Sequence, residues 1–136
     1  MTKNIYKYET IEFLPINKNK TRYGEGGLRL NSLSKKSLPN SPLISIITVV
    51  FNGEKHLQET IDSIKNQSYK NYEYIVIDGG STDRSLDIIK KNLSTIDYWI
   101  SEKDNGLYDA FNKGLRLAKG EFVGIINSDD TFEKEA

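Results

Sequence analysis

The chain has 136 residues, of which 37% are hydrophobic and 28% are charged, and this composition favours one folded domain over a disordered chain. It contains no cysteine, which excludes disulfides and thiolate chemistry. The longest apolar stretch, residues 43–51, is far shorter than the roughly 20 residues of a membrane-spanning helix. No secretory signal pattern opens the sequence, so we expect a cytoplasmic protein, with the inner face of the membrane as an alternative location.

Charge is distributed unevenly along the chain, although basic and acidic side chains balance overall. Residues 1–41 carry eight basic and three acidic side chains, whereas residues 42–136 carry eleven and sixteen. The first segment also lacks a sustained hydrophobic period and contains Gly24, Gly26 and Gly27. We therefore predict an irregular, solvated basic arm over residues 1–41 and a folded domain over residues 42–136, with no nucleic-acid partner.

Strand and helix patterns alternate through residues 42–136. The β-branched run at residues 44–51 is typical of a strand buried on both faces. The elements expected after it are a helix over 54–66, a strand over 74–77, a helix from Ser81 or Thr82 to Leu93, a strand over 96–101, a helix over 107–118 and a strand over 121–126. This order predicts an α/β, Rossmann-like fold, in which helices cover both faces of a parallel sheet.

Polar residues follow the predicted strands where each strand ends. Asn52, Asp78 and the pair Asp129–Asp130 all occupy such positions. In open parallel sheets, ligands bind beyond the carboxyl ends of the strands, at the point where the strand order reverses. We therefore expect these residues from different strands to face one crevice.

The adjacent Asp129 and Asp130 are the sharpest chemical feature of the sequence. Two neighbouring carboxylates repel each other unless a cation compensates them, and carboxylate oxygens suit Mg²⁺ or Mn²⁺. Because phosphate oxygens commonly complete the shell of Mg²⁺, the pair predicts a metal-bound diphosphate. The alternative is a turn or helix cap, for which Asn-Ser-Asp-Asp is equally suitable.

Two further segments allow both functional and purely structural interpretations. Asp78 could accept hydrogen bonds from a ribose hydroxyl or a base N–H, or it could form an Asx turn into Gly79. Residues 101–114 are rich in polar side chains near the start of a helix, where a phosphate would be favoured, but ordinary helix capping also explains them. The sequence has no G-x-G-x-x-G motif and no P-loop, so dinucleotide oxidoreductases and P-loop phosphotransferases are excluded.

Taken together, five segments resemble the nucleotide-sugar-binding half of family 2 glycosyltransferases, which have the GT-A fold. These segments are residues 45–52, 61–69, 76–83, 104–114 and 118–130. The resemblance covers residues 43–130 and is greatest to bacterial enzymes that build O-antigen or capsular polysaccharide. It implies that residues 42–136 are a GT-A donor-binding domain that is incomplete at its C-terminal end.

The resemblance implies transfer of a sugar from a nucleoside diphosphate sugar to a sugar or lipid-linked sugar acceptor, usually with inversion, in surface polysaccharide biosynthesis. It implies that Phe51 contacts the base, that Asp78 binds base or ribose, and that Asp130 binds Mg²⁺ or Mn²⁺. Asp129 is implied to bind the metal or the ribose. The other donor-binding residues that the resemblance implies are Val49, Asn52, Glu54, Asp104 and Gly106.

The sequence departs from the family pattern at several positions. Asn127 occupies the first position of the D-x-D pattern, Gly79 the second acidic position after the second strand, and Phe111 a position where many relatives carry arginine. The family's catalytic base and acceptor-binding part come later in sequence than Ala136. We therefore expect no catalytic base in this chain, no turnover by the chain alone, and self-association through an exposed edge of the last strand.

Two other functions are compatible with parts of the pattern. A noncatalytic nucleotide-binding or interaction module would use the same crevice without transferring a sugar. A phosphoacceptor receiver domain would also have an acidic pocket, but its acidic pair should follow the first strand, where this chain has Phe51-Asn52-Gly53.

Overall fold

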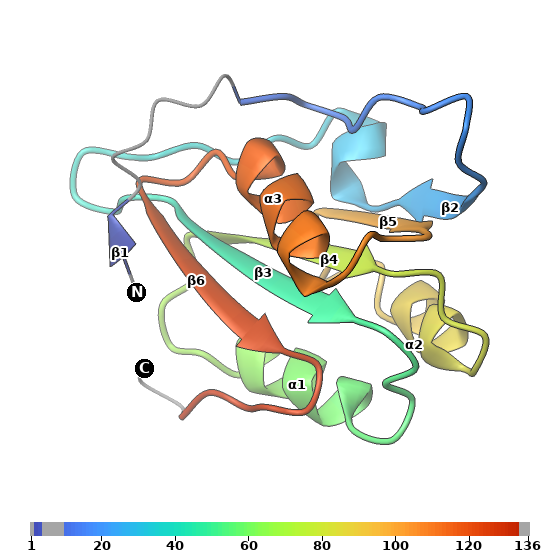
Figure 1. Ribbon diagram of the computed structural model, residues 1–136. Coiled ribbons are helices and arrows are strands. Elements are labelled where there is room, and N and C mark those ends of the chain that lie inside the picture. The colour runs from blue at the N-terminus through green and yellow to red at the C-terminus, as the bar shows by residue number, and fades with distance from the viewer. Residues whose placement is uncertain (1, 4–9, 134–136) are drawn as a thin grey trace.

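A computed structural model describes residues 2–3 and 10–133 of the chain (Figure 1). In this part of the chain the strands are β1 (Thr2–Lys3), β2 (Arg22–Gly26), β3 (Ile44–Val50), β4 (Tyr72–Asp78), β5 (Tyr98–Glu102) and β6 (Phe122–Asn127). The helices are the 3-10 helix η1 (Leu28–Asn31) and the α-helices α1 (Leu57–Lys65), α2 (Ser85–Lys91) and α3 (Leu107–Leu117). None of these helices has the length and apolar character needed to cross a membrane.

The described strands form one sheet in the order β1-β6-β3-β4-β5-β2. The four central strands, β6, β3, β4 and β5, are parallel, whereas β1 and β2 are antiparallel to their neighbours. Helix α3 covers one face of the sheet, and α1 and α2 cover the other (Figure 1). The predicted α/β, Rossmann-like sheet with helices on both faces is therefore confirmed. The chain runs from β3 through β4 to β5 and then returns to the other side of β3 as β6, so the strand order reverses between β3 and β6 and the switch point lies there.

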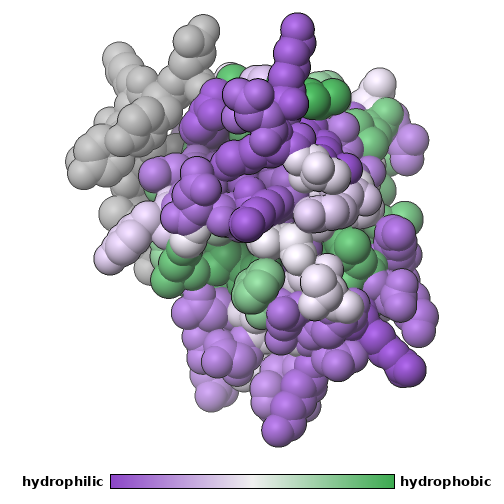
Figure 2. Space-filling view, turned by 45° about the vertical axis from the view of Figure 1, so that its right-hand side comes forward, coloured by the Kyte–Doolittle hydropathy of each residue, from purple (hydrophilic) through white to green (hydrophobic). Residues whose placement is uncertain are grey.

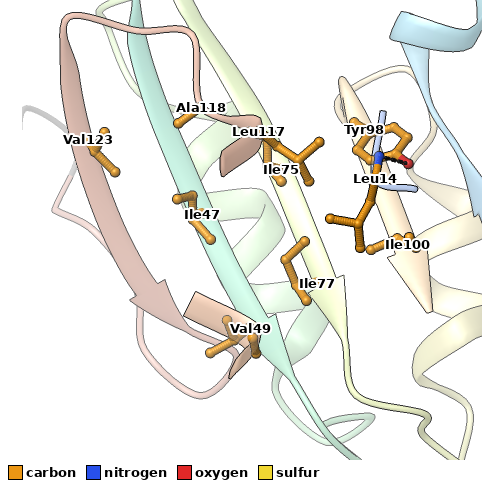
Figure 3. Packing of buried hydrophobic residues seen from close by; sticks show 11 residues of the cluster. Leu14, Ile47, Val49, Ile75, Ile77, Tyr98, Ile100, Leu117, Ala118 and Val123 are labelled. Atoms are coloured by element: carbon orange, nitrogen blue, oxygen red, sulfur yellow. Dashed lines mark hydrogen bonds between the residues drawn. The ribbon is translucent and has the colours of Figure 1, made fainter. Parts of the chain in front are cut away.

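Each face of the sheet has its own hydrophobic core, because successive side chains of a strand point to opposite faces. On β3, Ile47 and Val49 belong to the core under α3, whereas Ile46 and Val50 belong to the core over α1 and α2. Figure 3 shows residues of the first of these cores, which come from four strands and include Leu117, the last residue of α3. Full burial of each such aliphatic side chain contributes about 1.5–3 kcal/mol, so both faces stabilise the sheet.

The N-terminal segment is integrated into this architecture, so the expectation of an irregular arm is wrong for residues 22–31. Strand β2 pairs with β5, and the side chain of Leu14 is buried beside Tyr98 (Figure 3). Gly24 and Gly26 pack so closely on Trp99 that a Cβ at either position would lie within 2.7 Å of its ring. Gly24 and Gly26, which suggest a loop in the sequence, are therefore required within β2, because Trp99 on the neighbouring strand leaves no room for a side chain there. The domain boundary after residue 41 stays a prediction.

A buried ion pair also joins the N-terminal segment to the sheet. The guanidinium of Arg29 donates to both carboxylate oxygens of Glu73, at 2.7 and 3.1 Å, and to the backbone oxygen of Leu117 at 2.6 Å. The Glu73 carboxylate also accepts from the hydroxyl of Ser45 and from the backbone N–H of Lys119. This network lies at the amino ends of the central strands, away from the predicted crevice.

The outer edge of β6 differs from the expectation of a fully unpaired last strand. Strand β1 pairs with its beginning, where Thr2 lies opposite Val123 and Lys3 opposite Phe122. The expectation is therefore wrong at this end of β6, because the N-terminal segment returns to cover it. Self-association of the chain stays a prediction.

Helices α1 and α2 begin three to four residues later than predicted, at Leu57 and Ser85. The intervening residues form turns at the carboxyl ends of β3 and β4. Asn52 has a left-handed backbone conformation, with φ of 50°, which takes the chain out of β3 before the helix starts. The residues that were predicted to form the first turns of these helices therefore belong to the loops after β3 and β4.

Candidate functional site

A cleft of about 770 Å³ lies beyond the carboxyl ends of the parallel strands. Its walls come from the ends of β3 and β6, from the loops after β3, β4, β5 and β6, and from the start of α3. Polar and aromatic side chains that line it include Phe51, Asn52, Lys103, Asp104, Asn127 and Asp129. Figure 2, with the right-hand side of Figure 1 turned forward, shows less hydrophilic residues near the middle of the surface and hydrophilic residues around them.

Asn52 joins the loops after β3 and β4. Its side-chain oxygen accepts hydrogen bonds from the backbone N–H of Thr82 at 2.8 Å and of Asp83 at 3.3 Å. Its own backbone N–H donates to the hydroxyl of Ser81 at 2.8 Å. These bonds hold the neighbouring Phe51 at the cleft with 66% of its surface exposed. Asn52 therefore helps to fix the shape of the cleft by connecting the loops after β3 and β4.

Asp78 is fully buried and does not line the cleft. Its carboxylate accepts from the backbone N–H groups of Gly80 and Ser81, at 3.1 and 2.9 Å, and from the hydroxyls of Ser81 and Ser101. The Asx turn that the sequence left open is therefore formed. With its oxygens occupied by four donors, Asp78 shapes the Gly79–Gly80 turn, and its contact with a base or ribose stays a prediction.

Lys113 stands at the centre of an acidic cluster on one side of the cleft. Its ammonium lies 3.0 Å from Oε1 of Glu102 and 3.7 Å from Oδ2 of Asp109, and it also donates to Asp104. Burial raises the pKa of the Asp104 carboxyl, although its bond with Lys113 opposes this rise. Burial alone would lower the pKa of Lys113, but hydrogen bonds to Asp104 and Glu102 raise it. The ammonium therefore stays charged and compensates carboxylates that water reaches poorly.

The turn after β6 presents Asp129 and Asp130 to solvent. Thr60 on α1 fixes this turn, because its hydroxyl lies 2.6 Å from the backbone oxygen of Asp130 and 3.0 Å from that of Ser128. Both aspartates are exposed, and neither carboxylate has an ion-pair partner among residues 2–3 and 10–133. The same residues contain no cluster of three or more ligating side chains. A cation here would therefore take most of its ligands from water or a bound phosphate.

The structure brings most of the predicted donor-binding residues to the cleft. Those that line it are Val49, Phe51, Asn52, Asp104, Gly106 and Asp129, whereas Glu54, Asp78 and Asp130 do not. Ten further residues line the cleft that were not predicted to bind the donor, and the polar side chains among them are Lys55, His56, Lys103, Asn127 and Ser128. Lys103, Asn127 and Ser128 stand at or just after strand ends, so applying the carboxyl-end rule to every residue of each loop would have found them.

Comparison with known proteins places this arrangement in a family. The family model described as glycosyl transferase family 2 matches residues 45–136. An uncharacterized glycosyltransferase of Haemophilus influenzae is 42% identical over 94 residues, which cover 67% of this chain and 38% of that protein. TuaG of Bacillus subtilis, which carries the name of a teichuronic acid biosynthesis glycosyltransferase, is 35% identical over 98 residues, covering 69% of this chain and 38% of TuaG.

Two solved structures share the fold over most of this chain. TarS 1-349 of S. aureus, in complex with UDP-GlcNAc, has a TM-score of 0.61 at 30% identity, covering 67% of this chain and 28% of that chain. The mannosyltransferase PcManGT of Pyrobaculum calidifontis, in complex with GDP-Man and Mn²⁺, has a TM-score of 0.63 at 25% identity, covering 76% and 33%. The fold is therefore that of these glycosyltransferases.

The present chain spans well under half the length of the relatives that it matches. Its matched residues nevertheless contain the four central strands except Ile44, the α-helices α1 to α3 and the lining of the cleft. The family match, the sequence identities and the shared fold agree with one another, and they show that this chain belongs to glycosyl transferase family 2.

Proposed function

We propose that the cleft binds a nucleoside diphosphate sugar together with a divalent cation, and that this part of the protein serves sugar transfer to an acceptor hydroxyl. One observation carries the proposal: a cleft at the switch point of the sheet is lined by the exposed ring of Phe51 on the loop after β3 and by the exposed carboxylate of Asp129 on the loop after β6, next to the exposed Asp130. A nucleoside diphosphate has matching parts, a planar base and a charged diphosphate that takes up metal ions.

The base is proposed to lie on Phe51. An aromatic side chain that is 66% exposed while it lines a cleft has a free face, on which any base can stack. The neighbouring Asn52 holds this loop against the loop after β4, so the ring is supported by a rigid backbone. The proposal therefore assigns recognition of the nucleoside to the β3 and β4 loops.

The diphosphate is proposed to lie toward Asp129 and Asp130. Their exposed carboxylates are hard oxygen ligands of the type that Mg²⁺ and Mn²⁺ prefer, so the residues fit such a cation. When bound, the cation would neutralise charge on the departing diphosphate. PcManGT, bound to GDP-Man and Mn²⁺, supports Mn²⁺ as the first ion to test.

Basic side chains of the cleft add to this binding. Lys55 and Lys103 both line the cleft and come from the loops after β3 and β5. Their ammonium groups attract the negative diphosphate over several ångströms, and they can donate hydrogen bonds to its oxygens. In the proposed site these lysines orient the donor, while Thr60 holds the Asp129–Asp130 turn in place.

The acceptor is proposed to be a hydroxyl of a growing surface polysaccharide, on a sugar or a lipid-linked sugar. The name of TuaG supports this class of product. The noncatalytic-module alternative has less support, because the relatives reported above are named as glycosyltransferases. The receiver-domain alternative is not retained, because the chain belongs to a different family.

Calorimetric titration with UDP and with GDP, each with and without Mn²⁺, tests the proposal. We expect at least one of them to bind, and Mn²⁺ to strengthen the binding. Asp129→Asn and Asp130→Asn should each weaken the Mn²⁺-dependent binding by about tenfold or more, as expected for loss of a charged ligand. The control is Asp87→Asn, which changes an exposed aspartate in the first turn of α2. Failure of both nucleotides to bind with Mn²⁺, or unchanged binding by both variants, would contradict the proposal.

A further inference from the structure

Tyr23 occupies an irregular position in β2, a strand that lies outside the residues matched by the family model. Arg22 is opposite Glu102 and Gly24 is opposite Ser101, so Tyr23 is the additional residue of a β-bulge. A bulge bends its strand and re-aims the side chain of the inserted residue, often next to a functional site. Tyr23 is exposed, with 54% of its surface accessible.

The Tyr23 ring reaches the turn after β4. A Cβ built on Gly80 would lie 3.3 Å from Cε2 of Tyr23 and 3.5 Å from the backbone of Lys103. Lys103 lines the cleft, and so does Gly79, the residue directly before Gly80. The bulge of β2 therefore brings an aromatic ring from the N-terminal segment to the rim of the cleft.

An aromatic ring lies close to each of the two glycines of this turn. A Cβ built on Gly79 would lie 2.9 Å from Oδ2 of Asp104 and 3.6 Å from Cδ2 of Phe51, and one built on Gly80 would lie close to Tyr23. Gly80 also has a positive φ of 88°, which other residues rarely adopt. The two consecutive glycines therefore form a short stretch of backbone without side chains, with Phe51 close to Gly79 and Tyr23 close to Gly80.

The backbone on both sides of Tyr23 is held firmly. The guanidinium of Arg22 donates to Oε2 of Glu102 at 3.2 Å and to the backbone oxygens of Leu14 and Pro15 at 3.0 and 2.9 Å. Gly24, on the other side, packs against Trp99. Because the backbone that carries Tyr23 is already ordered, binding of a ligand to its ring does not require this backbone to lose further conformational freedom.

From this arrangement we propose that Tyr23 is a second aromatic contact for the base of the donor nucleotide and contributes to its affinity and selectivity. The inference rests on the proposed function, because it requires a nucleotide in the cleft. Phe51 lies close to Gly79 and Tyr23 close to Gly80, so a planar base over the two glycines can contact both rings. The N-terminal segment thereby supplies part of the binding site.

The test is titration of UDP and GDP, with Mn²⁺, into the full chain and into Tyr23→Ala, Tyr23→Phe and Tyr69→Ala. Tyr23→Ala should weaken binding of the preferred nucleotide about 5- to 10-fold, as expected for loss of a partly exposed stacking partner. Tyr23→Phe should retain the affinity, because the ring remains. Tyr69→Ala is the matched control, since Tyr69 is partly exposed before β4, away from the cleft.

Fluorescence of Trp99, the single tryptophan, shows whether β2 stays in place in each variant. Trp99 is buried against Gly24 and Gly26, so detachment of β2 would expose it and shift its emission to longer wavelength. Weaker binding by Tyr23→Ala with unshifted emission would support the inference. Unchanged affinity in Tyr23→Ala, or a loss accompanied by a shifted emission, would overturn it. If the unchanged chain bound neither nucleotide, the proposed function itself would fail.

Discussion

Replacing Lys113 with methionine removes the cation at the centre of the acidic cluster beside the cleft. Lys113 contacts Glu102 and Asp104, and the side chains of all three residues are less than 10% exposed. Methionine retains most of the apolar length of lysine, so the variant isolates the charge. After the change Glu102 keeps its ion pair with Arg22 at 3.2 Å, and Asp104 has no cation within the described part of the chain.

The expected loss of stability depends on this difference between Glu102, which keeps a cation, and Asp104, which does not. Removing one partner of a buried ion pair typically costs about 3–5 kcal/mol of the free energy of unfolding. Glu102 remains paired, and Asp104 lines the cleft, where water can partly hydrate it. We therefore expect Lys113→Met to lower the free energy of unfolding by about 2–3 kcal/mol.

Urea unfolding followed by circular dichroism measures this loss, and its pH dependence tests the cause. Burial raises the pKa of Asp104 and Lys113 opposes the rise, so the pKa should rise further in the variant. A carboxylate whose pKa is raised in the folded state lowers the free energy of unfolding while it is ionised, and this loss disappears when the carboxylate is protonated. The difference in the free energy of unfolding between the unchanged chain and Lys113→Met should therefore become smaller from about pH 7 to about pH 5.

Two further variants complete the experiment. Lys113→Met combined with Asp104→Asn should recover about 1 kcal/mol or more, because no unpaired charge remains. Lys20→Met is the control, since Lys20 pairs with Asp109 at 3.6 Å on the surface and should cost about 0–1 kcal/mol. A loss below about 1 kcal/mol in Lys113→Met, or a gap that is independent of pH, would refute the reasoning.

Three other substitutions test the architecture by the same urea measurement. Arg29→Met leaves the buried carboxylate of Glu73 without its ion-pair partner and should lower the free energy of unfolding by about 3–5 kcal/mol. An unchanged midpoint of urea unfolding would contradict the presence of a stabilising buried ion pair. A Cβ on Gly114 would lie 2.5 Å from Ile47, so Gly114→Ala should cost about 1–3 kcal/mol despite alanine's better helix propensity; a stabilised variant would show that the packing is looser. Burial would raise the pKa of Asp83, but hydrogen bonds from Ser85 and Glu54 lower it. Because a lowered pKa contributes stability that is lost on acidification, the deficit of Asp83→Asn should shrink between about pH 6 and about pH 3, and a constant deficit would argue against this role.

The parallel sheet and its helices are predictable because their signals are local. The β-branched run that becomes β3 and the helical spacing of Leu57, Ile61 and Ile64 depend only on residues within one element. The carboxyl-end rule then brings Phe51, Asn52 and Asp129 to one cleft without knowledge of any side-chain contact. Local pattern and general topology therefore account for the centre of the fold and the position of the cleft.

The N-terminal segment could not be predicted because its signals depend on distant partners. Gly24 and Gly26 read as loop residues until Trp99 is known to lie against them. Arg29 reads as a solvated charge, yet its partner Glu73 is 44 positions away. In both cases a residue that is unusual for its local structure is explained by one contact that the sequence does not specify.

The role of Asp78 was undecided for a related reason. An Asx turn and a ligand contact require the same residue type at the same place, after a strand and before glycine. The choice depends on the hydroxyl of Ser101, 23 positions later on the neighbouring strand, which donates to the Asp78 carboxylate. Only the register of β4 against β5 brings these two side chains together.

The strand order has a consequence for synthesis of the chain. Strand β3 is the first of the parallel strands to be made, but one of its two neighbours, β6, is the last. Their paired residues Ile44 and Phe122 are 78 positions apart, which corresponds to about 4–16 s at the usual rates of translation. During this interval β3 and β4 can pair, while the other edge of β3 stays open.

An open edge on a strand this apolar can template pairing with another chain. Such long-range parallel pairing is also slow, because the loop must close before its contacts form. The ribosome-bound chain is therefore most prone to aggregate after β3 emerges and before β6 does. A chaperone that covers one sheet edge during those seconds would protect the nascent chain at its most vulnerable stage.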